Sequence, residues 1–355
     1  QGYSSAASDV YKRQGFYREY FKQFKGMFDR IFMMGVSPVT LDGLSSGYNI
    51  DWNISVDEIF NAMMGFEEAE VREMFRYYQQ NDMLKGDVEA MITEMKPWYD
   101  NYCFARMSLN DDRVFNCDMT LYYLNYQVQR GSSPEEMVDK NIRTDYSKLK
   151  MLARIDRDSV QEGDRMSTIE KIAAEGDIFV DLHTSFPAER ITDIDNFRSL
   201  LYYYGLLTMC GTRGDLIKMS IPNNCVREQY FGFLRDYYQK YSSIDLHYLN
   251  VMLTDMAYDG RWKPFFESVA QAYRENSAVR DAMEGERNLQ GFLKAYLALA
   301  SYYLVEPELE MNYGYCDFFL LPDKKRYPDV KHSYILELKY ATRTAVSYTH
   351  LTLPT

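Results

Sequence analysis

The chain has few of the residues that build metal clusters or disulfide frameworks. Its 355 residues include five cysteines and four histidines. The cysteines are scattered, with no C-x-x-C pair and no histidine at zinc-ligand spacing. Such cysteines are typical of reduced thiols, in the core or at the surface of a cytosolic protein. We therefore expect neither a zinc motif nor a disulfide framework.

Long apolar runs are also missing. No stretch of about 18 consecutive apolar residues is present, and no signal-peptide pattern is found. These absences predict a cytoplasmic protein that does not span a membrane.

Positive charge is in deficit as well. The chain carries 40 Lys and Arg against 52 Asp and Glu, which gives a net charge of −12 at pH 7. This balance argues against indiscriminate electrostatic binding of nucleic acid, but it is compatible with a local basic groove. A nucleic-acid partner therefore has to be argued from a local site.

Both ends of the chain look foreign to the rest. Residues 1–14 and 346–355 resemble translated sequencing-adapter sequence, and the chain does not begin with Met. We exclude both ends from the fold prediction and expect the natural part to be residues 15–345, open at both ends. Its length and composition, 46% hydrophobic and 26% charged over the whole chain, predict two domains or one large one.

The start of the natural part has the pattern of an α/β fold. Residues 16–28 predict an amphipathic helix, and residues 31–34 predict a buried strand that ends in a Gly-Val-Ser-Pro turn. Ligands in α/β folds bind at the carboxyl ends of strands, so Ser37 and Thr40 are candidates to contact a nucleotide. The alternative is a simple Ser-Pro turn.

Helical periodicity dominates the middle of the chain. Helices are predicted over residues 67–78 and 87–98, where apolar residues recur at helical spacing. Asn116 or Asp118 is expected to cap another helix. Residues 132–200 are expected to be mostly helical.

Two strands followed by a helix are expected further on. Residues 200–209 predict a helix end and a strand, and residues 216–221 predict a second strand, with Gly211–Gly214 as the turn. Asn223 or Asn224 is expected to cap the helix that follows. The combination resembles a winged-helix-like element. Further helices are predicted over residues 226–241, 246–258, 262–282 and 289–303.

Two short segments near the C-terminal end predict neighbouring strands, Gly314–Pro322 and Tyr334–Tyr340. Because side chains alternate along a strand, Glu337 and Lys339 share one face with Ile335. The other face carries Leu336, Leu338 and Tyr340 and can pack on a core. If the two strands pair, Asp317 lies beside Glu337.

This arrangement suggests a metal site. Two close carboxylates repel each other, and a hard cation such as Mg²⁺ relieves the repulsion by binding both through oxygen. A lysine beside the metal can orient a water molecule and stabilise negative charge on a phosphate. The alternative is a solvated strand face with an ordinary Glu–Lys pair, since Glu-x-Lys is a common tripeptide.

An Asp followed by Glu-x-Lys on consecutive strands resembles the PD-(D/E)XK nuclease superfamily. The resemblance implies catalytic roles for Asp317, Glu337 and Lys339. It also implies that Mg²⁺ is held by Asp317, Glu337 and the main-chain carbonyl of Leu338. Another acidic residue is usual on the helix before the strands, and the candidates are Glu286, Glu308 and Glu310.

A wider resemblance covers nearly all of residues 15–345. The chain resembles bacterial AAA-ATPase-like proteins with a C-terminal PD-(D/E)XK nuclease domain. The segments that carry the resemblance are Arg30–Pro38, Leu44–Ile50, Trp98–Phe104, Val114–Asn116, Leu200–Leu207, Ile221–Asn223, Gly314–Asp317 and Glu337–Lys339. It implies a helix-rich α/β chain. Residues 15–240 would form the later part of a P-loop NTPase domain with a winged-helix-like region, and residues 241–345 a truncated restriction-endonuclease-like α/β domain.

The sequence departs from this family at the nucleotide site. No G-x-x-x-x-G-K-[ST] string occurs in residues 15–345. We therefore expect ATP only in a full-length parent, with Ser37 and Thr40 at a sensor-like turn.

Three functions compete on these grounds. The first is a fragment of an ATPase-coupled, Mg²⁺-dependent nuclease that hydrolyses phosphodiester bonds of nucleic acid, with DNA the expected partner. The second is an ATP-binding regulatory or partner-binding module whose nuclease-like domain binds without cleaving. The third is a helical scaffold without catalysis.

Overall fold

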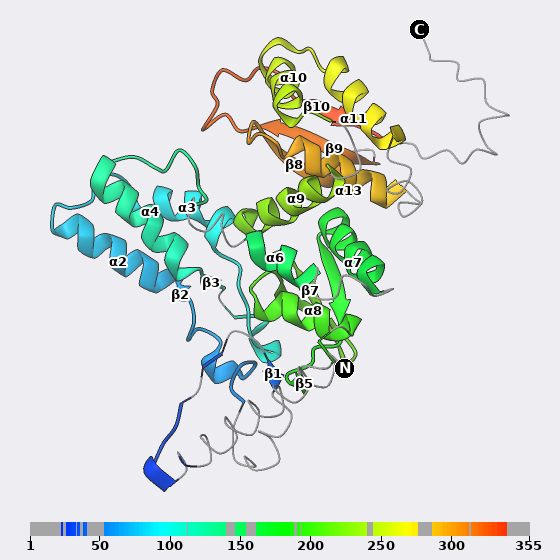
Figure 1. The fold of residues 1–355 in the computed structure, drawn as a ribbon. Helices are drawn as coiled ribbons and strands as arrows, with labels where there is room; N and C mark the ends of the chain where they lie inside the picture. Colours follow the sequence, from blue (N-terminus) through cyan, green and yellow to red (C-terminus); the bar gives the residue numbers. More distant parts are fainter. Residues whose placement is uncertain are drawn as a thin grey trace, which may run out of the picture. The chain divides into compact units, whose positions relative to one another are not determined.

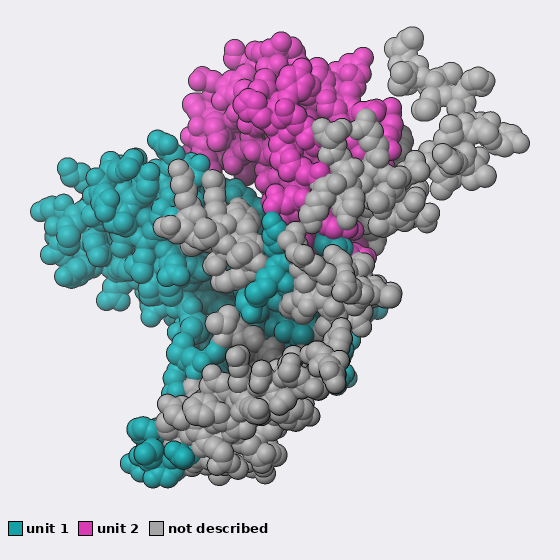
Figure 2. Space-filling model, in the orientation of Figure 1, with its two compact units in different colours: residues 1–166, 177–229 teal, residues 167–176, 230–355 magenta. Residues whose placement is uncertain are grey.

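The protein is helix-rich, with small and mainly antiparallel sheets (Figure 1). It divides into two compact units (Figure 2): unit 1 comprises residues 1–166 and 177–229, and unit 2 comprises residues 167–176 and 230–355. The computed structural model describes residues 23, 26–32, 34–35, 38–40, 53–111, 113–139, 146–153, 161–187, 190–191, 193–239, 244–275, 286–311 and 314–338.

The first helices of unit 1 begin and end where local signals predict. The expected helices at residues 67–78 and 87–98 are confirmed as α2 (Glu68–Gln80) and α3 (Val88–Tyr99). Asp87 caps α3, because its carboxylate accepts a bond from the Glu89 N–H at 3.0 Å. Helix α4 (Cys117–Arg130) is capped by Asn116, which accepts from the Met119 N–H at 3.0 Å.

These three helices enclose the core of the N-terminal part of unit 1. Phe75 of α2, Met95 and Tyr99 of α3 and Tyr123 of α4 are each fully buried. Burial of such side chains stabilises the fold by about 1.5–3 kcal/mol each. A short antiparallel pairing of β2 (Phe66–Glu67) with β3 (Val114–Phe115) joins the start of α2 to the segment before α4.

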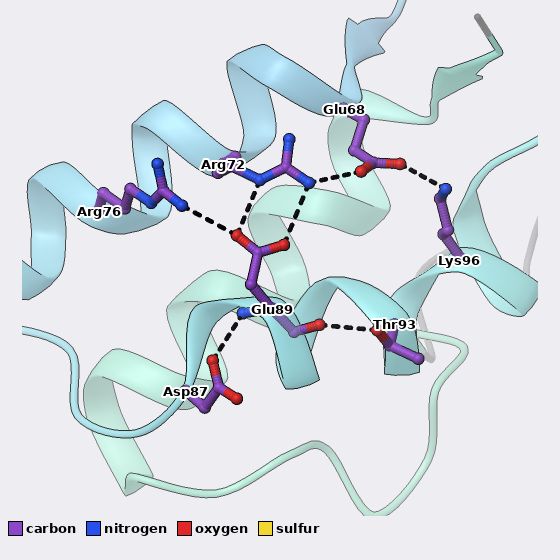
Figure 3. Close-up of polar contacts among 7 residues, drawn as sticks. All are labelled: Glu68, Arg72, Arg76, Asp87, Glu89, Thr93 and Lys96. Atoms are coloured by element: carbon purple, nitrogen blue, oxygen red, sulfur yellow. Dashed lines mark hydrogen bonds and ion pairs between the residues drawn. The ribbon is translucent and has the colours of Figure 1, made fainter.

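A chain of ion pairs joins the exposed faces of α2 and α3 (Figure 3). Arg72 pairs with Glu68 at 2.5 Å and with Glu89 at 2.8 Å. Arg76 also pairs with Glu89, and Lys96 pairs with Glu68. Hydrogen bonds from Lys96 and Arg72 lower the pKa of Glu68. The network links the surfaces of the two helices without contributing a site, since its charges are all paired.

The second part of unit 1 is built on a three-stranded antiparallel sheet in the order β4-β7-β6. Its strands are β4 (Asp177–Val180), β6 (Thr208–Arg213) and β7 (Leu216–Ser220). Helices α6 (Tyr146–Ala153) and α8 (Ile194–Tyr203) contact each other, and α8 also contacts β4. The region of residues 132–200 is therefore only partly helical, because β4 and β5 (Phe186–Pro187) interrupt it.

The expected hairpin and following helix are confirmed, with one correction. Strand β6 continues through Gly211 to Arg213, so the turn consists of only two residues. Gly214 has a φ of 61°, the left-handed conformation that a two-residue hairpin turn requires. Helix α9 (Asn224–Tyr238) follows, and the Asn223 side chain caps it by accepting from the Val226 N–H at 3.2 Å.

The strand predicted at residues 31–34 is wrong. Ile31, Phe32 and Met34 lie in irregular backbone and are 40%, 62% and 71% exposed. A strand needs a partner for its N–H and C=O groups. Among the described residues before Asn53, only β1 (Val39–Thr40) has one, and it pairs in parallel with β5.

This two-residue pair is the only parallel pairing among the described residues. The described part of the chain therefore contains no parallel sheet of the P-loop NTPase kind.

Unit 2 combines helices with a second antiparallel sheet. Helices α10 (Leu246–Asp259), α11 (Lys263–Glu275) and α13 (Glu286–Leu297) precede three strands, β8 (Tyr303–Met311), β9 (Gly314–Pro322) and β10 (Tyr334–Leu336). Part of α7 (Gln161–Glu175) also belongs to this unit. The helix expected at residues 289–303 ends earlier, at Leu297, and the residues that follow it turn into β8. Within the described ranges no helix has both the length and the hydrophobicity needed to cross a bilayer.

Candidate functional site

The candidate site lies on the three-stranded sheet of unit 2, in the order β10-β9-β8 (Figure 1). The expected pairing of the two C-terminal strands is confirmed, and it is antiparallel. Tyr334 lies across from Leu320, and Leu336 lies across from Phe318. The register is therefore fixed up to the residue that precedes Glu337.

The two faces of β9 differ in burial. Cys316, Phe318 and Leu320 are 4%, 0% and 0% exposed, so they form the core side of the strand. Asp317 and Phe319 alternate with them and are half-buried. Asp317 thus lies on the open face, as the alternation of side chains predicts.

Helix α13 covers the core side of this sheet. Lys294 is 5% exposed, and its ammonium lies 5.6 Å from the centre of the Phe318 ring. The same ammonium donates a hydrogen bond to the carbonyl of Ala174. This lysine therefore belongs to the packing of the core side and not to the open face that bears Asp317.

Asp317 is tied to the chain segment that carries the Glu-x-Lys sequence. Its Oδ2 accepts a hydrogen bond from the backbone N–H of Leu338 at 2.6 Å. Glu337, which is exposed, stands between Leu338 and the paired residue Leu336. The structure therefore brings Asp317 and the Leu338 backbone together where β10 ends, and Glu337 is the neighbouring residue of that segment.

Strand β8 was not anticipated from the sequence, and it adds an acidic position. Pro307 pairs with Phe318 and Leu309 pairs with Cys316, so Glu308 occupies the position across from Asp317. The expectation of an acidic residue on the preceding helix is wrong for Glu308 and Glu310, which lie in β8. Glu286 is the first residue of α13.

The open carboxylates have the chemistry of a hard-cation site. Among the described residues neither Asp317 nor Glu337 forms an ion pair, so no protein cation neutralises them there. Carboxylate and carbonyl oxygens are the ligands that Mg²⁺ prefers. No group of three His, Cys, Asp or Glu side chains that could hold a metal ion is found within the described part. The described residues therefore offer such a cation the carboxylates of Asp317 and Glu337 and main-chain oxygen, and do not by themselves assemble a complete metal site.

Two tyrosines lie at the opposite end of these strands from Asp317, since Tyr334 is across from Leu320 and Tyr303 is across from Pro322. The Tyr334 hydroxyl donates to the carbonyl of Met256 in α10 at 2.8 Å, and its ring lies 6.1 Å from that of Tyr303. Burial raises the pKa of both phenols. Both therefore stay protonated at neutral pH and are unsuited to act as bases.

The remaining predicted site residues are less fully described. Lys339 and Ser37 lie outside the described residues. Thr40 is the last residue of β1, and its backbone pairs with Pro187. Its proposed contact with a nucleotide stays a prediction.

Comparison with known proteins identifies the same part of the chain. Residues 284–350 match the family model of the PD-(D/E)XK nuclease superfamily, a segment that contains Asp317, Glu337 and Lys339. The expected resemblance of this segment is thereby confirmed, whereas the match lends no support to an AAA-ATPase region. Neither the search of curated proteins nor the search of solved structures gave a significant match.

Proposed function

We propose that the sheet of unit 2 carries a metal-dependent phosphodiesterase site that acts on nucleic acid. The observation that supports it most is the 2.6 Å hydrogen bond from the Leu338 N–H to Asp317. This bond holds the peptide of the Glu-Leu-Lys segment against the Asp317 carboxylate. The match of residues 284–350 to a nuclease superfamily supports the same chemistry.

Each residue of the site has a separate role in this proposal. Asp317 and Glu337 supply carboxylate oxygens for Mg²⁺, and the Leu338 carbonyl supplies a third ligand. Glu308, across from Asp317 in the β8–β9 register, would supply a further carboxylate. A bound Mg²⁺ neutralises phosphate charge and lowers the pKa of water.

Lys339 would orient the attacking water and stabilise charge on the phosphate. The water forms a new bond to phosphorus while the bond to one ester oxygen breaks. The leaving oxygen takes up a proton to become a hydroxyl.

The finer parts of the proposal rest on the sequence resemblance. DNA is the proposed substrate, because the superfamily is one of nucleases. Coupling to ATP is proposed only for a longer parent, since residues 15–345 contain no P-loop string.

A cleavage assay on the intact chain tests the proposal. Labelled double-stranded DNA, single-stranded DNA and RNA are incubated with Mg²⁺ or with EDTA. We expect cleavage only with Mg²⁺. Asp317→Asn and Glu337→Gln should each lower the rate about a hundredfold or more, since even outer-shell partners of metal sites cost up to that factor.

Asp329→Asn is the matched control, because Asp329 is exposed in the connection between β9 and β10. It should cleave at the wild-type rate. Nucleic-acid binding without cleavage by the wild type, with Mg²⁺ present, would contradict the enzymatic proposal and favour a binding role.

A further inference from the structure

The open face of the unit 2 sheet carries an apolar patch beside Asp317. Residues that lie directly across from each other in a sheet share a face. Leu304 of β8 lies across from Leu321 of β9, and Ile335 of β10 lies across from Phe319 of β9 (Figure 1). Along β9, the side chains of Asp317, Phe319 and Leu321 alternate with buried ones, so all three belong to the open face.

The patch is accessible and contiguous. Leu304, Leu321 and Ile335 are 40%, 41% and 54% exposed, and Phe319 is half-buried. The Cβ atoms of directly opposed residues are about 5 Å apart, and the next position of the same face lies about 7 Å along the strand. The patch therefore begins about one nucleotide's span from Asp317, and exposed apolar surface of this kind marks a binding site.

The open face offers little to a second phosphate backbone. Proteins hold backbone phosphates largely through Arg and Lys. The positions of this face whose side chains the structure describes contain neither residue type, and they are Leu304, Asp317, Phe319, Leu321, Ile335 and Glu337. In the proposed mechanism Lys339 serves the scissile phosphate itself.

Positive charge returns just beyond the far end of the patch. Three consecutive basic residues, Lys324, Lys325 and Arg326, follow β9. Asp323 shapes their turn, because its Oδ1 accepts hydrogen bonds from the N–H groups of Lys325 and Arg326, each at 3.2 Å. Lys324 and Lys325 are exposed. The apolar patch thus lies between two places that suit a phosphate, Asp317 with its metal and this basic turn, about 17 Å apart along β9.

We propose that the apolar patch seats an unpaired nucleobase next to the scissile phosphate, so that the site acts on single-stranded nucleic acid. In a duplex the base faces are stacked on one another, and mainly phosphates and groove edges reach a protein surface. In a single strand the bases are free to pack on aromatic and apolar side chains. This inference rests on the proposed nuclease function and names the form of its substrate.

A labelled DNA strand without self-complementarity and the same strand annealed to its complement are matched substrates. Both are cleaved by the intact chain with Mg²⁺, and initial rates are compared. The single strand should be cleaved at least about fivefold faster, the low end of what one stacked base contributes.

Variants of the patch test the contact. Ile335→Thr keeps the β-branched shape and removes apolar surface, so it should raise KM for the single strand about fivefold and change kcat little. Leu321→Thr should act in the same direction. Leu216→Thr is the matched control, because Leu216 of β7 is also a strand leucine, 40% exposed, and belongs to unit 1.

Equal cleavage of the duplex and the single strand would overturn this inference and leave the nuclease proposal standing. A wild-type KM for the single strand in both Ile335→Thr and Leu321→Thr would do the same. A wild-type dimer that Ile335→Thr converts to a monomer, measured by light scattering, would show that a second copy covers the patch and would also overturn it.

The absence of cleavage on either substrate would contradict the nuclease proposal instead. Binding of the two substrates with Ca²⁺, measured by fluorescence anisotropy, then decides the inference. Tighter binding of the single strand that is lost in Ile335→Thr would support it, and equal affinity for the two substrates would overturn it.

Discussion

Two carboxylic acids of unit 2 lie in different environments, one on the open face of a sheet and one in the core. Asp317 is half-buried on an open sheet face and receives a main-chain hydrogen bond. Glu170 of α7 is 6% exposed, and its only hydrogen bond among the described residues comes from the Tyr238 hydroxyl at 3.2 Å. Burial raises the pKa of Glu170 to about 7, which the hydrogen bond from Tyr238 only partly opposes. Glu170 is therefore suited to a protonated, structural role.

The raised pKa of Glu170 predicts a pH dependence of stability. In the unfolded chain this carboxyl group has its ordinary pKa of 4.5, so the folded state binds the proton more tightly. The stabilisation is fully present below pH about 4.5 and is lost as the pH rises through about 7. A shift of this size corresponds to about 3 kcal/mol of unfolding free energy.

Urea denaturation at pH 5 and pH 8 measures this effect. Glu170→Gln should remove that part of the pH dependence, whereas the exposed control Glu267→Gln should keep it. Equal pH dependence in the wild type and in Glu170→Gln would show that Glu170 is already ionised at pH 5.

At the scale of elements, the sequence predicts helices better than strands. Helices α3 and α4 begin where Asp87 and Asn116 cap them. The side chain of each capping residue accepts a hydrogen bond from an N–H group in the first turn of its helix. Such capping signals depend on neighbouring residues alone, so the start of the helix can be predicted from the sequence. The failure at residues 31–34 has the opposite cause, because a short apolar run forms a strand only where a distant segment pairs with it.

Strand β8 shows a signal that was present in the sequence. Val305, Pro307 and Leu309 alternate with three glutamates, the period-2 pattern of a strand with one open face. The preceding run of apolar residues obscured the point where the helix ends. Of the candidate site, the pairing of β9 with β10 and the place of Asp317 were predictable. The position of Glu308 was not, because it depends on a register between strands.

This register predicts different roles for two glutamates of the same strand. Glu308 lies across from Asp317, whereas Glu310 pairs with Tyr315, two positions further along. Glu308→Gln should weaken Mg²⁺ binding about tenfold, and Glu310→Gln should change it little. Titration calorimetry with Mg²⁺ measures both. An equal effect of the two substitutions would contradict a site centred on Asp317.

At the scale of the whole molecule, charge limits how nucleic acid can bind. A chain with a net charge of −12 gains little from non-specific attraction to phosphate. A metal ion held by Asp317 and Glu337 would replace local repulsion with attraction. Binding of DNA should therefore depend on the metal.

Fluorescence anisotropy of a labelled DNA duplex tests this dependence. Ca²⁺, which takes the same oxygen ligands as Mg²⁺, should tighten binding about tenfold relative to EDTA, and Asp317→Asn should remove most of that gain. The dependence of affinity on salt should be shallow, with only about two or three phosphates neutralised. Tight binding in EDTA with a steep salt dependence would instead indicate a basic surface elsewhere.

The central claim is that Asp317 and Glu337 hold a divalent metal at the end of β10. Mn²⁺ binding to the intact chain, followed by electron paramagnetic resonance, tests it most directly because it requires neither substrate nor turnover. The account predicts one site that Mg²⁺ displaces, with affinity lowered at least about tenfold by Asp317→Asn and unchanged by Asp329→Asn. Equal Mn²⁺ affinity in the wild type and Asp317→Asn would contradict it.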